Sequence, residues 1–596
     1  MGLRAREPAA LAYADGAAAG PALPRRREPA AAVRLPARHG ARADRGQPPV
    51  QPGARARVRG RVGQSPVIKR RELLAAAAAG TALLAGCDAA GGRREVPGGW
   101  VGAAVERGHR LREARPGPAS GPARRAEVVV VGSGIAGLAC ARELARAGID
   151  DVAVLELEDR AGGNARGHAI AGLGCPLGAH YLPVPGEDDE PIYALCEELG
   201  LVKRESGRAV WDELHLCHSL QERLFYQREW IEGLLPPAQT ETTREQYLHF
   251  ARLVEQARRE WGFAVPTHRA PWTPDHARLD AQPFTAWLDA HGLGDAQLRW
   301  YLDYCCRDDY GAPASAVSAW AGVHYFASRH GFHPPGDGHD EAEPVLTWPE
   351  GNGWLANQLA APLGARVHPG RTVLRVDAGR DAVDVLAFDE AQHRPERWIA
   401  KRVVLATPLS IADRLVGGSV APLHEAAAAG RHAPWLVANL LLDEAPLERA
   451  GAPRAWDNVV YGAASGQLGY VDASHQLLSP AGGPLVLSAY LALDEAQRPA
   501  LLKQDWPVWL GRVLDGLHEV HPRLRDQLRR ADLMRWGHGM SIPFPGRRGS
   551  AALAALRAPQ GRLHFAHADL SAYSVFEEAY TQGLRAAAEI VKLDRG

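Results

Sequence analysis

A glycine-rich turn near residue 135 constrains the fold more than any other part of the chain. The stretch Ala126–Val131 is an uninterrupted apolar run rich in valine, which is typical of a buried parallel strand. It runs directly into the sequence Gly-Ser-Gly-Ile-Ala-Gly at 132–137, and an apolar helical pattern follows. A strand, a glycine-rich turn and a helix in this order predict the first half of a βαβ unit.

Each glycine of this turn has a separate physical purpose. We expect Gly132 to allow the tight bend after the strand, Gly134 to let a diphosphate approach the backbone, and Gly137 to let the helix pack closely on the strand. The following helix would begin near Ile135 and Ala136, where free N–H groups and the positive end of the helix dipole favour phosphates. A glycine-rich turn that binds no ligand is the alternative.

A second strand follows at the distance expected for a βαβ unit. Val152–Leu155 is apolar and ends in Glu156, 19 residues after Gly137. A carboxylate at that place accepts hydrogen bonds from the ribose hydroxyls of an adenine dinucleotide. Glu158 is a competitor, but it comes after the strand. The pattern therefore predicts an α/β, Rossmann-type domain that binds a dinucleotide.

Further segments resemble the flavin-containing amine oxidase superfamily. Gly162-Gly163 follows Glu156 by six and seven residues, and Gly-Ala-His-Tyr comes at 178–181. Where that family usually has Arg directly after the glycine pair, this chain has Asn164, with Arg166 two residues further on. The resemblance is also found near the C-terminus, where an apolar strand at 562–566 precedes His-Ala-Asp at 567–569. Residues 577–583 then lead into a closing helix, Leu584–Val591.

The resemblance covers residues 126–596 and implies a two-lobed fold, with an FAD-binding domain and a mixed α+β substrate domain. It implies noncovalent FAD, because some relatives tether the flavin through a Cys near the position of His538 and this chain has no Cys there. The implied cofactor-binding residues are Gly132, Gly134, Ile135, Ala136, Gly137, Glu156, Gly162, Gly163, Gly178, Ala179, His180, Asp569, Glu578 and Gly583.

Catalytic candidates follow from the same resemblance. Flavin amine oxidation needs orientation and aromatic walls more than acid–base help from the protein. The candidates are Trp536, His538, Asn439 and Tyr580. Asn439 lies on the strand where many relatives carry a lysine, and this chain has no lysine there. No metal site is predicted.

Recognition of a cationic amine would need aromatic or acidic side chains. Aromatic candidates for a cation–π contact are Tyr181, Tyr310, Trp320, Tyr325, Trp354, Trp536, Tyr573 and Tyr580. Asp308-Asp309 follows a predicted helix at 284–307 and could recognise a polyamine ammonium. Core packing for the aromatic residues, and a solvated turn for the acids, are the alternatives.

The first 125 residues do not have the pattern of a folded domain. Residues 1–66 contain 13 Arg, nine Pro and four acidic residues, and they predict a disordered leader or a start codon chosen too far upstream. Arg70-Arg71 precedes a 14-residue apolar stretch that ends before Cys87. This resembles a twin-arginine export signal with a lipoprotein cleavage site, and Cys87 would carry the lipid. We expect the protein in the periplasm or anchored to a membrane of the cell envelope.

The predicted organisation follows from these patterns: leader 1–66; export signal 67–87; flexible linker 88–125; FAD-binding domain 126–205, 345–418 and 533–596; substrate domain 206–344, mainly helical, and 419–532. Lys+Arg and Asp+Glu are both 69, which excludes the basic footprint of a nucleic-acid binder. The predicted function is an exported FAD-dependent oxidoreductase that takes a hydride from an amine, with export machinery as its partner. A C–C desaturase or isomerase, and a non-catalytic FAD-stabilised binding protein, stay open.

Overall fold

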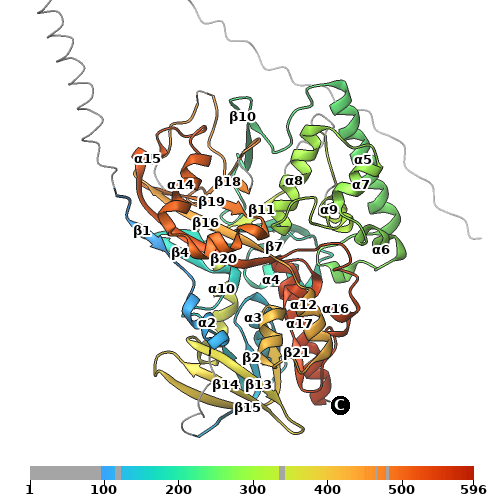
Figure 1. Ribbon diagram of the computed structural model, residues 1–596, viewed down its shortest axis with the longest axis vertical. Helices are drawn as coiled ribbons and strands as arrows, with labels where there is room; N and C mark the ends of the chain where they lie inside the picture. Colours follow the sequence, from blue (N-terminus) through green and yellow to red (C-terminus); the bar gives the residue numbers. More distant parts are fainter. Residues whose placement is uncertain are drawn as a thin grey trace, which may run out of the picture. The chain divides into compact units, whose positions relative to one another are not determined.

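The computed structural model describes residues 95–113, 122–329, 331–334, 343–449, 451–463, 466–477 and 482–595 (Figure 1). The leader, the export signal and Cys87 lie outside these ranges. Arg93–Gly596 forms one compact unit. Two large sheets organise this unit, and they confirm the two-lobed α/β fold.

A seven-stranded sheet carries the predicted dinucleotide-binding unit. Its parallel part contains β2 (Arg124–Val131), β3 (Val152–Leu155), β12 (Val367–His368), β21 (Leu563–Phe565) and the end of β15 (Arg394–Leu405). The antiparallel strands β13 (Arg371–Ala378) and β14 (Val383–Asp389) extend it. Helix α3 (Ile135–Arg146) connects β2 to β3, and the C-terminal α17 (Phe576–Arg595) packs along α3. The other helices of this lobe are α4 (Glu190–Glu198), α10 (Gly353–Ala360), α11 (Leu409–Leu415), α12 (Ala421–Ala429) and α16 (Ala551–Ala555).

An eight-stranded sheet forms the second lobe, in the order β1-β20-β16-β19-β18-β17-β9-β10. The strands are β1 (Gly98–Trp100), β20 (Leu528–Ser541), β16 (His432–Leu442), β19 (Leu485–Ala492), β18 (Gln467–Asp472), β17 (Asp457–Val460), β9 (Glu222–Tyr226) and β10 (Glu229–Glu232). Helices α5 (Glu241–Trp261), α6 (Pro274–Asp280), α7 (Phe284–Ala290), α8 (Ala296–Tyr310) and α9 (Ala319–Ala327) form a group beside the sheet (Figure 1). Helices α13 (Arg498–Lys503), α14 (Trp506–Gly516) and α15 (Leu524–Gln527) pack their apolar side chains against one face of the same sheet.

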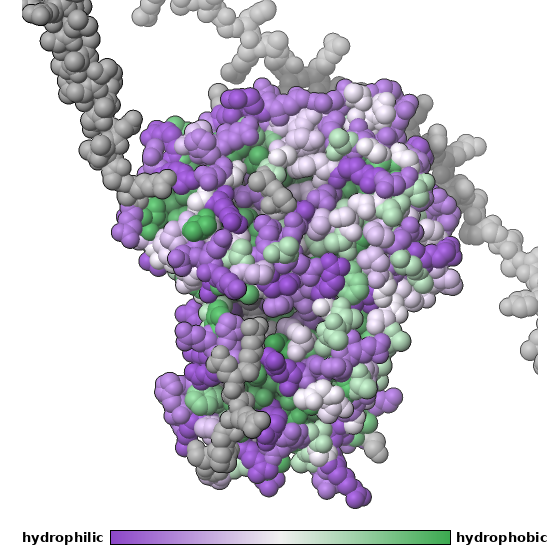
Figure 2. All heavy atoms as spheres, in the orientation of Figure 1, coloured by the Kyte–Doolittle hydropathy of each residue, from purple (hydrophilic) through white to green (hydrophobic). Residues whose placement is uncertain are grey.

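Short hairpins and pairs complete the described fold. They are β4 (Gly167–Ile170) with β5 (Leu173–Pro176), β6 (Tyr181–Pro183) with β11 (Val345–Thr347), and β7 (Val202–Glu205) with β8 (Arg208–Trp211). None of the helices in the described ranges is long and apolar enough to cross a membrane. The face shown in Figure 2 is mostly hydrophilic, and its apolar residues form scattered patches.

The predicted flexible linker at 88–125 is wrong for residues 95–113. Here β1 pairs in parallel with β20, and α2 (Val105–Glu113) packs against β13. The linker prediction rested on the Gly-, Pro- and Arg-rich composition of this segment. Its Trp100 nevertheless packs against the core of the eight-stranded sheet. This segment therefore belongs to the folded unit and contacts both lobes.

Two other boundaries differ from the prediction. The helix expected over 284–307 is two helices, because Gly292 takes a positive φ of 68° and Asp295 caps a new helix, α8. The division expected at residue 533 falls inside β20, which stays in the eight-stranded sheet until Ser541. The region 206–344 also contributes β9 and β10 to that sheet, so it is less helical than expected.

Candidate cofactor and substrate cavity

A cavity of about 400 Å³ extends between the two sheets. Its lining contains these predicted site residues: Gly132, Gly134, Ile135, Ala136, Glu156, Gly162, Gly163, Gly178, Ala179, His180, Trp536, His538 and Asp569. They come from five separate segments of the chain, and the fold brings them to one continuous surface. The sequence prediction therefore locates most of one end of the cavity.

The glycines of the 132–137 turn have the purposes that the sequence suggests. Gly132 has φ of 98°, and a Cβ there would lie 2.7 Å from the carbonyl oxygen of Ala406. A Cβ at Gly137 would overlap the carbonyl oxygen of Gly132, so this glycine allows the helix to pack on the turn rather than line the cavity. A Cβ at Gly134 would meet only the Cα of Gly163, at 3.9 Å. Protein packing alone does not require glycine at 134, but a ligand in the groove would.

The acid at the end of β3 is held by the glycine-rich turn. Glu156 is 7% exposed and accepts hydrogen bonds from the backbone N–H of Ser133 at 2.8 Å and from its hydroxyl at 2.6 Å. The second glycine loop closes the same groove, because the N–H of Gly162 donates to the carbonyl of Ser133 at 2.8 Å. The ribose-binding acid and both phosphate-binding loops are thus fixed to one another before any ligand binds.

Buried polar atoms without partners indicate that the cavity suits a polar cofactor. Within the described ranges, the Oδ1 of Asn352, the Oγ1 of Thr407 and the Oγ of Ser541 line or border the cavity and have no hydrogen-bond partner. Unpaired buried polar groups cost free energy, so such a group of atoms implies a ligand that bonds to them. The glycine loops, Glu156 and these atoms together fit an adenine dinucleotide with a polar ring system.

Asp569, the predicted ribityl-binding acid, lies between two histidines. Its carboxylate is 3.2 Å from the Nε2 of His432 and 3.4 Å from the Nδ1 of His567, and it accepts the N–H of Leu409 at 3.0 Å. Burial alone would raise the pKa of Asp569, but the two histidines outweigh it and hold the pKa well below its usual range. Burial would lower the pKa of His432, but Asp569 outweighs it and raises the pKa.

Besides Gly137, four predicted residues do not reach the cavity. Helix α17 begins at Phe576 instead of after Gly583, so the residues 577–583 are distributed around a helix, and only some of them face inward. Glu578 is 1% exposed and accepts the N–H of Thr267. Tyr580 stacks on Phe576 in the core of the dinucleotide lobe. A Cβ at Gly583 would overlap the carbonyl oxygen of Ala136, so Gly583 allows α17 to pack on α3. The fourth is Asn439.

Asn439 is held away from the cavity by its own hydrogen bonds. On β16, Trp435 and Val437 line the cavity, and Asn439 continues the same strand face beyond its end. Its side chain donates to the carbonyl of Pro176 at 2.8 Å and accepts the hydroxyl of Ser488, and it is fully buried. The predicted catalytic position of Asn439 is therefore wrong. The described lining contains no lysine and no cysteine.

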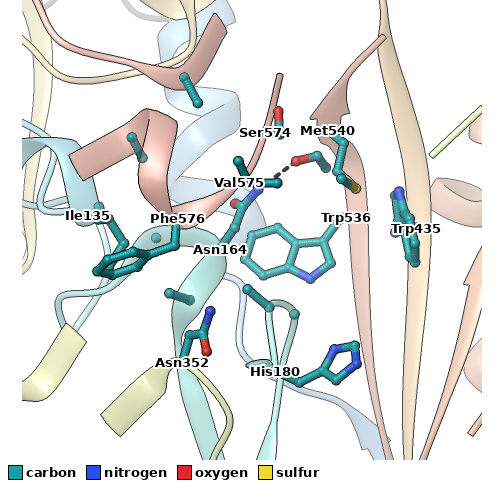
Figure 3. Close-up of a pocket in the computed structure, with 18 of the residues that line it drawn as sticks. Ile135, Asn164, His180, Asn352, Trp435, Trp536, Met540, Ser574, Val575 and Phe576 are labelled. Carbon is teal, nitrogen blue, oxygen red and sulfur yellow. Dashed lines mark hydrogen bonds between the residues drawn. The ribbon is translucent and has the colours of Figure 1, made fainter. Parts of the chain in front are cut away.

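Two tryptophans form the wall of the substrate end. Trp435 on β16 and Trp536 on β20 are direct cross-strand partners, and both line the cavity. Figure 3 shows both indoles pointing into the same space beside Met540, with Asn164 approaching Trp536 from the opposite side. The Nε1 of Trp536 donates to the carbonyl of Leu177 at 2.6 Å, whereas the Nε1 of Trp435 has no partner in the described protein.

Most of the other aromatic candidates are core residues. Tyr181 lines the cavity, but Tyr310 donates to the carbonyl of Ala321, and Trp354 stacks on Trp348. Trp320 and Tyr325 pack in the helical core, and Tyr573 donates to the Oδ2 of Asp309 at 2.6 Å. The aromatic residues of the lining that were not predicted from the sequence are Tyr304, Trp435, Tyr470, Tyr490 and Phe576.

Acidic side chains face the aromatic wall. Asp309 is paired with Arg329 at 3.1 Å, but Asp308 and Asp457 form no ion pair within the described ranges. Burial, and then the neighbouring Asp309, raises the pKa of Asp308 to about 7. Burial, and then Asp308 and Glu222, raises the pKa of Asp457 well above its usual range. The cavity thus contains two carboxyl groups whose charged forms have no ion-pair partner in the described protein. No metal-binding cluster of these groups occurs among the described residues.

Part of this aromatic and acidic lining is predictable from the sequence. Tyr304 and Asp308 are four residues apart on α8, so a helical interpretation places them on one face. Trp435 and Val437 alternate on β16. Asp457 has no such signal, because it stands on a four-residue strand, and one of the two neighbours of that strand in the sheet, β9, is distant in sequence.

The fold and cavity define a dinucleotide-binding protein of two lobes, with a substrate chamber between an aromatic wall and two free carboxylates. The model of the family "flavin containing amine oxidoreductase" matches residues 135–591, and the chain belongs to that family. This family assignment places the chain among the FAD-dependent oxidoreductases. The residues at the glycine-rich end fit the dinucleotide part of FAD.

Individual relatives agree with this family. A protein of Mycobacterium tuberculosis named as a flavin-containing monoamine oxidase is 29% identical over 272 residues, which are 45% of this chain and 54% of that protein. The match thus spans about half the length of that relative. An L-amino acid dehydrogenase of Synechocystis is 21% identical over 79% of this chain and 96% of its own. A putrescine oxidase structure with bound putrescine has a TM-score of 0.59 at 20% identity, covering 79% of this chain and 100% of that chain.

Proposed function

We propose that the protein oxidises an amine that carries a second cationic group, such as a diamine or polyamine. The observation that carries the proposal is the pair Asp308 and Asp457, which lines the same cavity as Trp435 and Trp536 and has no cationic partner among the described residues. A second ammonium would supply the missing charge. Bound FAD would supply the oxidant, which takes a hydride equivalent from the carbon next to the reacting nitrogen.

Different side chains of the cavity would then bind different parts of the substrate. The indoles of Trp435 and Trp536 would confine the substrate and attract a nearby cation by ~0.5–2 kcal/mol. Asp308 and Asp457 would hold the distal ammonium, and each charged hydrogen bond is worth roughly 1.5–3 kcal/mol. The substrate nitrogen gives up a proton as the carbon gives up the hydride, and the resulting imine hydrolyses in water. The distance between the aromatic wall and the carboxylates would select the length of the substrate.

The charged cavity argues against the two alternatives. An apolar substrate for C–C desaturation or isomerisation would leave Asp308 and Asp457 buried without partners, which is costly. A non-catalytic FAD-stabilised protein would be favoured by a substrate chamber filled with its own side chains, but the cavity continues beyond the glycine loops to Trp435, Asp308 and Asp457. Neither alternative explains the unpaired carboxylates.

The test is anaerobic reduction of the purified yellow protein. Putrescine, spermidine, butylamine and an amino acid are mixed with it in separate samples, and the visible flavin absorbance is followed. We expect the diamine and the polyamine to bleach the flavin at lower concentrations than butylamine. Absence of bleaching with every amine would contradict amine oxidation, although FAD binding would stand.

We also propose that the protein is exported and anchored by a lipid. The support is in the sequence: Arg70-Arg71, a short apolar stretch, and Leu-Ala-Gly before Cys87. Twin-arginine export carries folded proteins, so FAD could bind in the cytoplasm first. Replacement of Arg70 and Arg71 by Lys should leave the precursor in the cytoplasm, as measured by cell fractionation, and Cys87→Ser should release the protein from the membrane fraction. An unchanged envelope location of the double variant would contradict the proposal.

A further inference from the structure

A buried arginine lies behind the cavity wall and connects four parts of the chain. Arg166 follows the 3₁₀ turn Gly163–Ala165 and is 8% exposed. It is not one of the residues that line the cavity. Its contacts extend to the phosphate-binding loops, to Trp536, and to the segment that precedes the dinucleotide-binding strand.

On the cofactor side, Arg166 fixes the second glycine loop. Its Nε donates to the carbonyl of Gly163 at 3.1 Å. The neighbouring Gly162 pairs with Gly134 of the first glycine turn in a parallel bridge. A change at Arg166 would therefore alter the mutual position of the two loops that form the diphosphate groove.

On the substrate side, the same residue holds the indole of Trp536. The carbonyl of Arg166 accepts the N–H of Leu177 at 3.1 Å, and the carbonyl of Leu177 accepts the Nε1–H of Trp536. The Arg166 guanidinium also lies over the Trp536 ring, 5.6 Å from its centre. The backbone of residue 166 thus supports the edge of the indole through Leu177, whereas the Arg166 side chain lies over its face. A second hydrogen bond also connects the glycine loop to β20: the Nδ2 of Asn164 donates to the carbonyl of Gly539 at 2.6 Å.

The third set of contacts reaches residues 98–113, which we call the strap. The strap consists of β1, α2 and the four residues between them. The Nη1 of Arg166 donates to the carbonyl of Gly102, and the Arg166 guanidinium pairs with Glu158 at 3.4 Å. Glu158 in turn accepts the N–H of Ala104 at 3.0 Å. Since β1 is also hydrogen-bonded to β20, the strap supports Arg166 from the side opposite the cavity.

We propose that Arg166 is a positioning residue that couples the diphosphate groove to the tryptophan wall, and that the strap holds it in place. Arg166 touches neither substrate nor cofactor. It acts through Gly163 on one side and through Leu177 and Trp536 on the other. The cofactor half of this inference is independent of the proposed function, and only the substrate half rests on it.

The first experiment measures FAD binding without any substrate. Apoprotein is titrated with FAD, and the quenching of flavin fluorescence gives Kd. We expect Arg166→Met to raise Kd about ten-fold, the effect of losing one hydrogen bond to a charged group. Arg166→Lys should not restore affinity, because an ammonium cannot donate to Gly163 and Gly102 while lying flat over an indole. Wild-type affinity of Arg166→Met, or full rescue by Lys, would overturn the proposal.

The strap gives a matched pair of variants that leaves Arg166 in place. Gly102 has φ of 85°, and a Cβ there would lie 2.8 Å from Leu177 and 2.9 Å from Met534. Gly102→Ala should therefore displace the strap and weaken FAD binding in the same direction as Arg166→Met. The control is Gly108→Ala on α2, where a Cβ would meet nothing within 4 Å. Equal Kd values for Gly102→Ala, Gly108→Ala and the wild type would overturn the role of the strap.

The substrate half is tested with any amine that reduces the flavin. At saturating FAD, Arg166→Met should raise KM for that amine while kcat changes less, because the tryptophan wall shifts but the reacting groups do not. The double variant with Trp536→Leu, which removes the ring under the guanidinium, should be less than additive in KM, since both changes remove the same contact. Strict additivity would overturn the coupling. If no amine reduces the flavin, the proposed substrate class fails, and the FAD titrations still decide the role of Arg166.

Discussion

The two ends of the cavity are built in different ways. The cofactor end consists mainly of backbone, held by glycines at 132–137 and 162–163, with Glu156 bonded to Ser133 before any ligand binds. The substrate end consists of side chains from β16, β17, β20 and α8, and it contains carboxylates without partners. The first end is held together by hydrogen bonds within the protein, although Asn352 and Thr407 keep polar atoms without partners. The second end contains carboxyl groups without ion-pair partners, which is the basis of the proposal that the substrate supplies positive charge.

The largest expected effect is at the cofactor end. Gly134→Val would place a branched side chain in the diphosphate groove, where only Gly163 comes within 4 Å, so the fold should survive and FAD should not bind. We expect a colourless protein with a wild-type far-UV circular dichroism spectrum. The control is Gly294→Val, where a Cβ would meet nothing within 4 Å. A yellow Gly134→Val protein with stoichiometric FAD would contradict the position of the diphosphate groove at this end of the cavity.

At the substrate end, the carboxylates should discriminate between one and two positive charges. Asp457→Asn and Asp308→Asn should each lower kcat/KM for a diamine about ten-fold or more, the value of a charged hydrogen bond, and change it little for a monoamine of equal length. The measurement is steady-state kinetics with putrescine and butylamine. Equal losses for both amines would show that the carboxylates do not bind the distal ammonium.

The pH dependence of kcat/KM tests the same role of Asp308. Because the pKa of Asp308 is raised to about 7, its carboxylate forms only as the pH rises through that value. kcat/KM for a diamine should therefore increase with pH around 7, and Asp308→Asn should remove this increase. Stability should respond in the opposite sense, since an unpaired buried charge opposes folding. Relative to Asp308→Asn, the wild type should lose thermal stability as the pH rises from about 4, the unfolded pKa of Asp, to about 7.

A smaller effect is expected beside the cofactor end, at His432. Its pKa is raised in the folded protein by Asp569, so the stabilisation from this pair is complete below about pH 6.5, the unfolded value. It is lost as the pH rises through the folded value. His432→Gln should therefore lower the melting temperature of the protein at pH 6 more than at pH 9. An equal loss at both values would mean that the pair is held by packing rather than by charge.

The difference between the two ends also explains what the sequence could predict. The strand, turn and helix at 126–146 are contiguous, and local packing requires glycine at 132 and 137, so the fold class and the groove follow from a short segment. Glu578, Tyr580 and Gly583 were misplaced because the start of α17 at Phe576 decides which of them face inward. Asp457 and Trp435 line the same cavity because their strands belong to one sheet, whose strand order the sequence does not give. The strap was not predicted because its composition is typical of a linker.

The most direct test of the account is the anaerobic titration of the yellow protein with putrescine and with butylamine, in the wild type and in the double variant Asp308→Asn, Asp457→Asn. The account predicts that putrescine reduces the wild-type flavin at much lower concentration than butylamine, and that the double variant loses this preference while it keeps its FAD. Equal preference in the double variant and the wild type, or no flavin reduction by either amine, would contradict it.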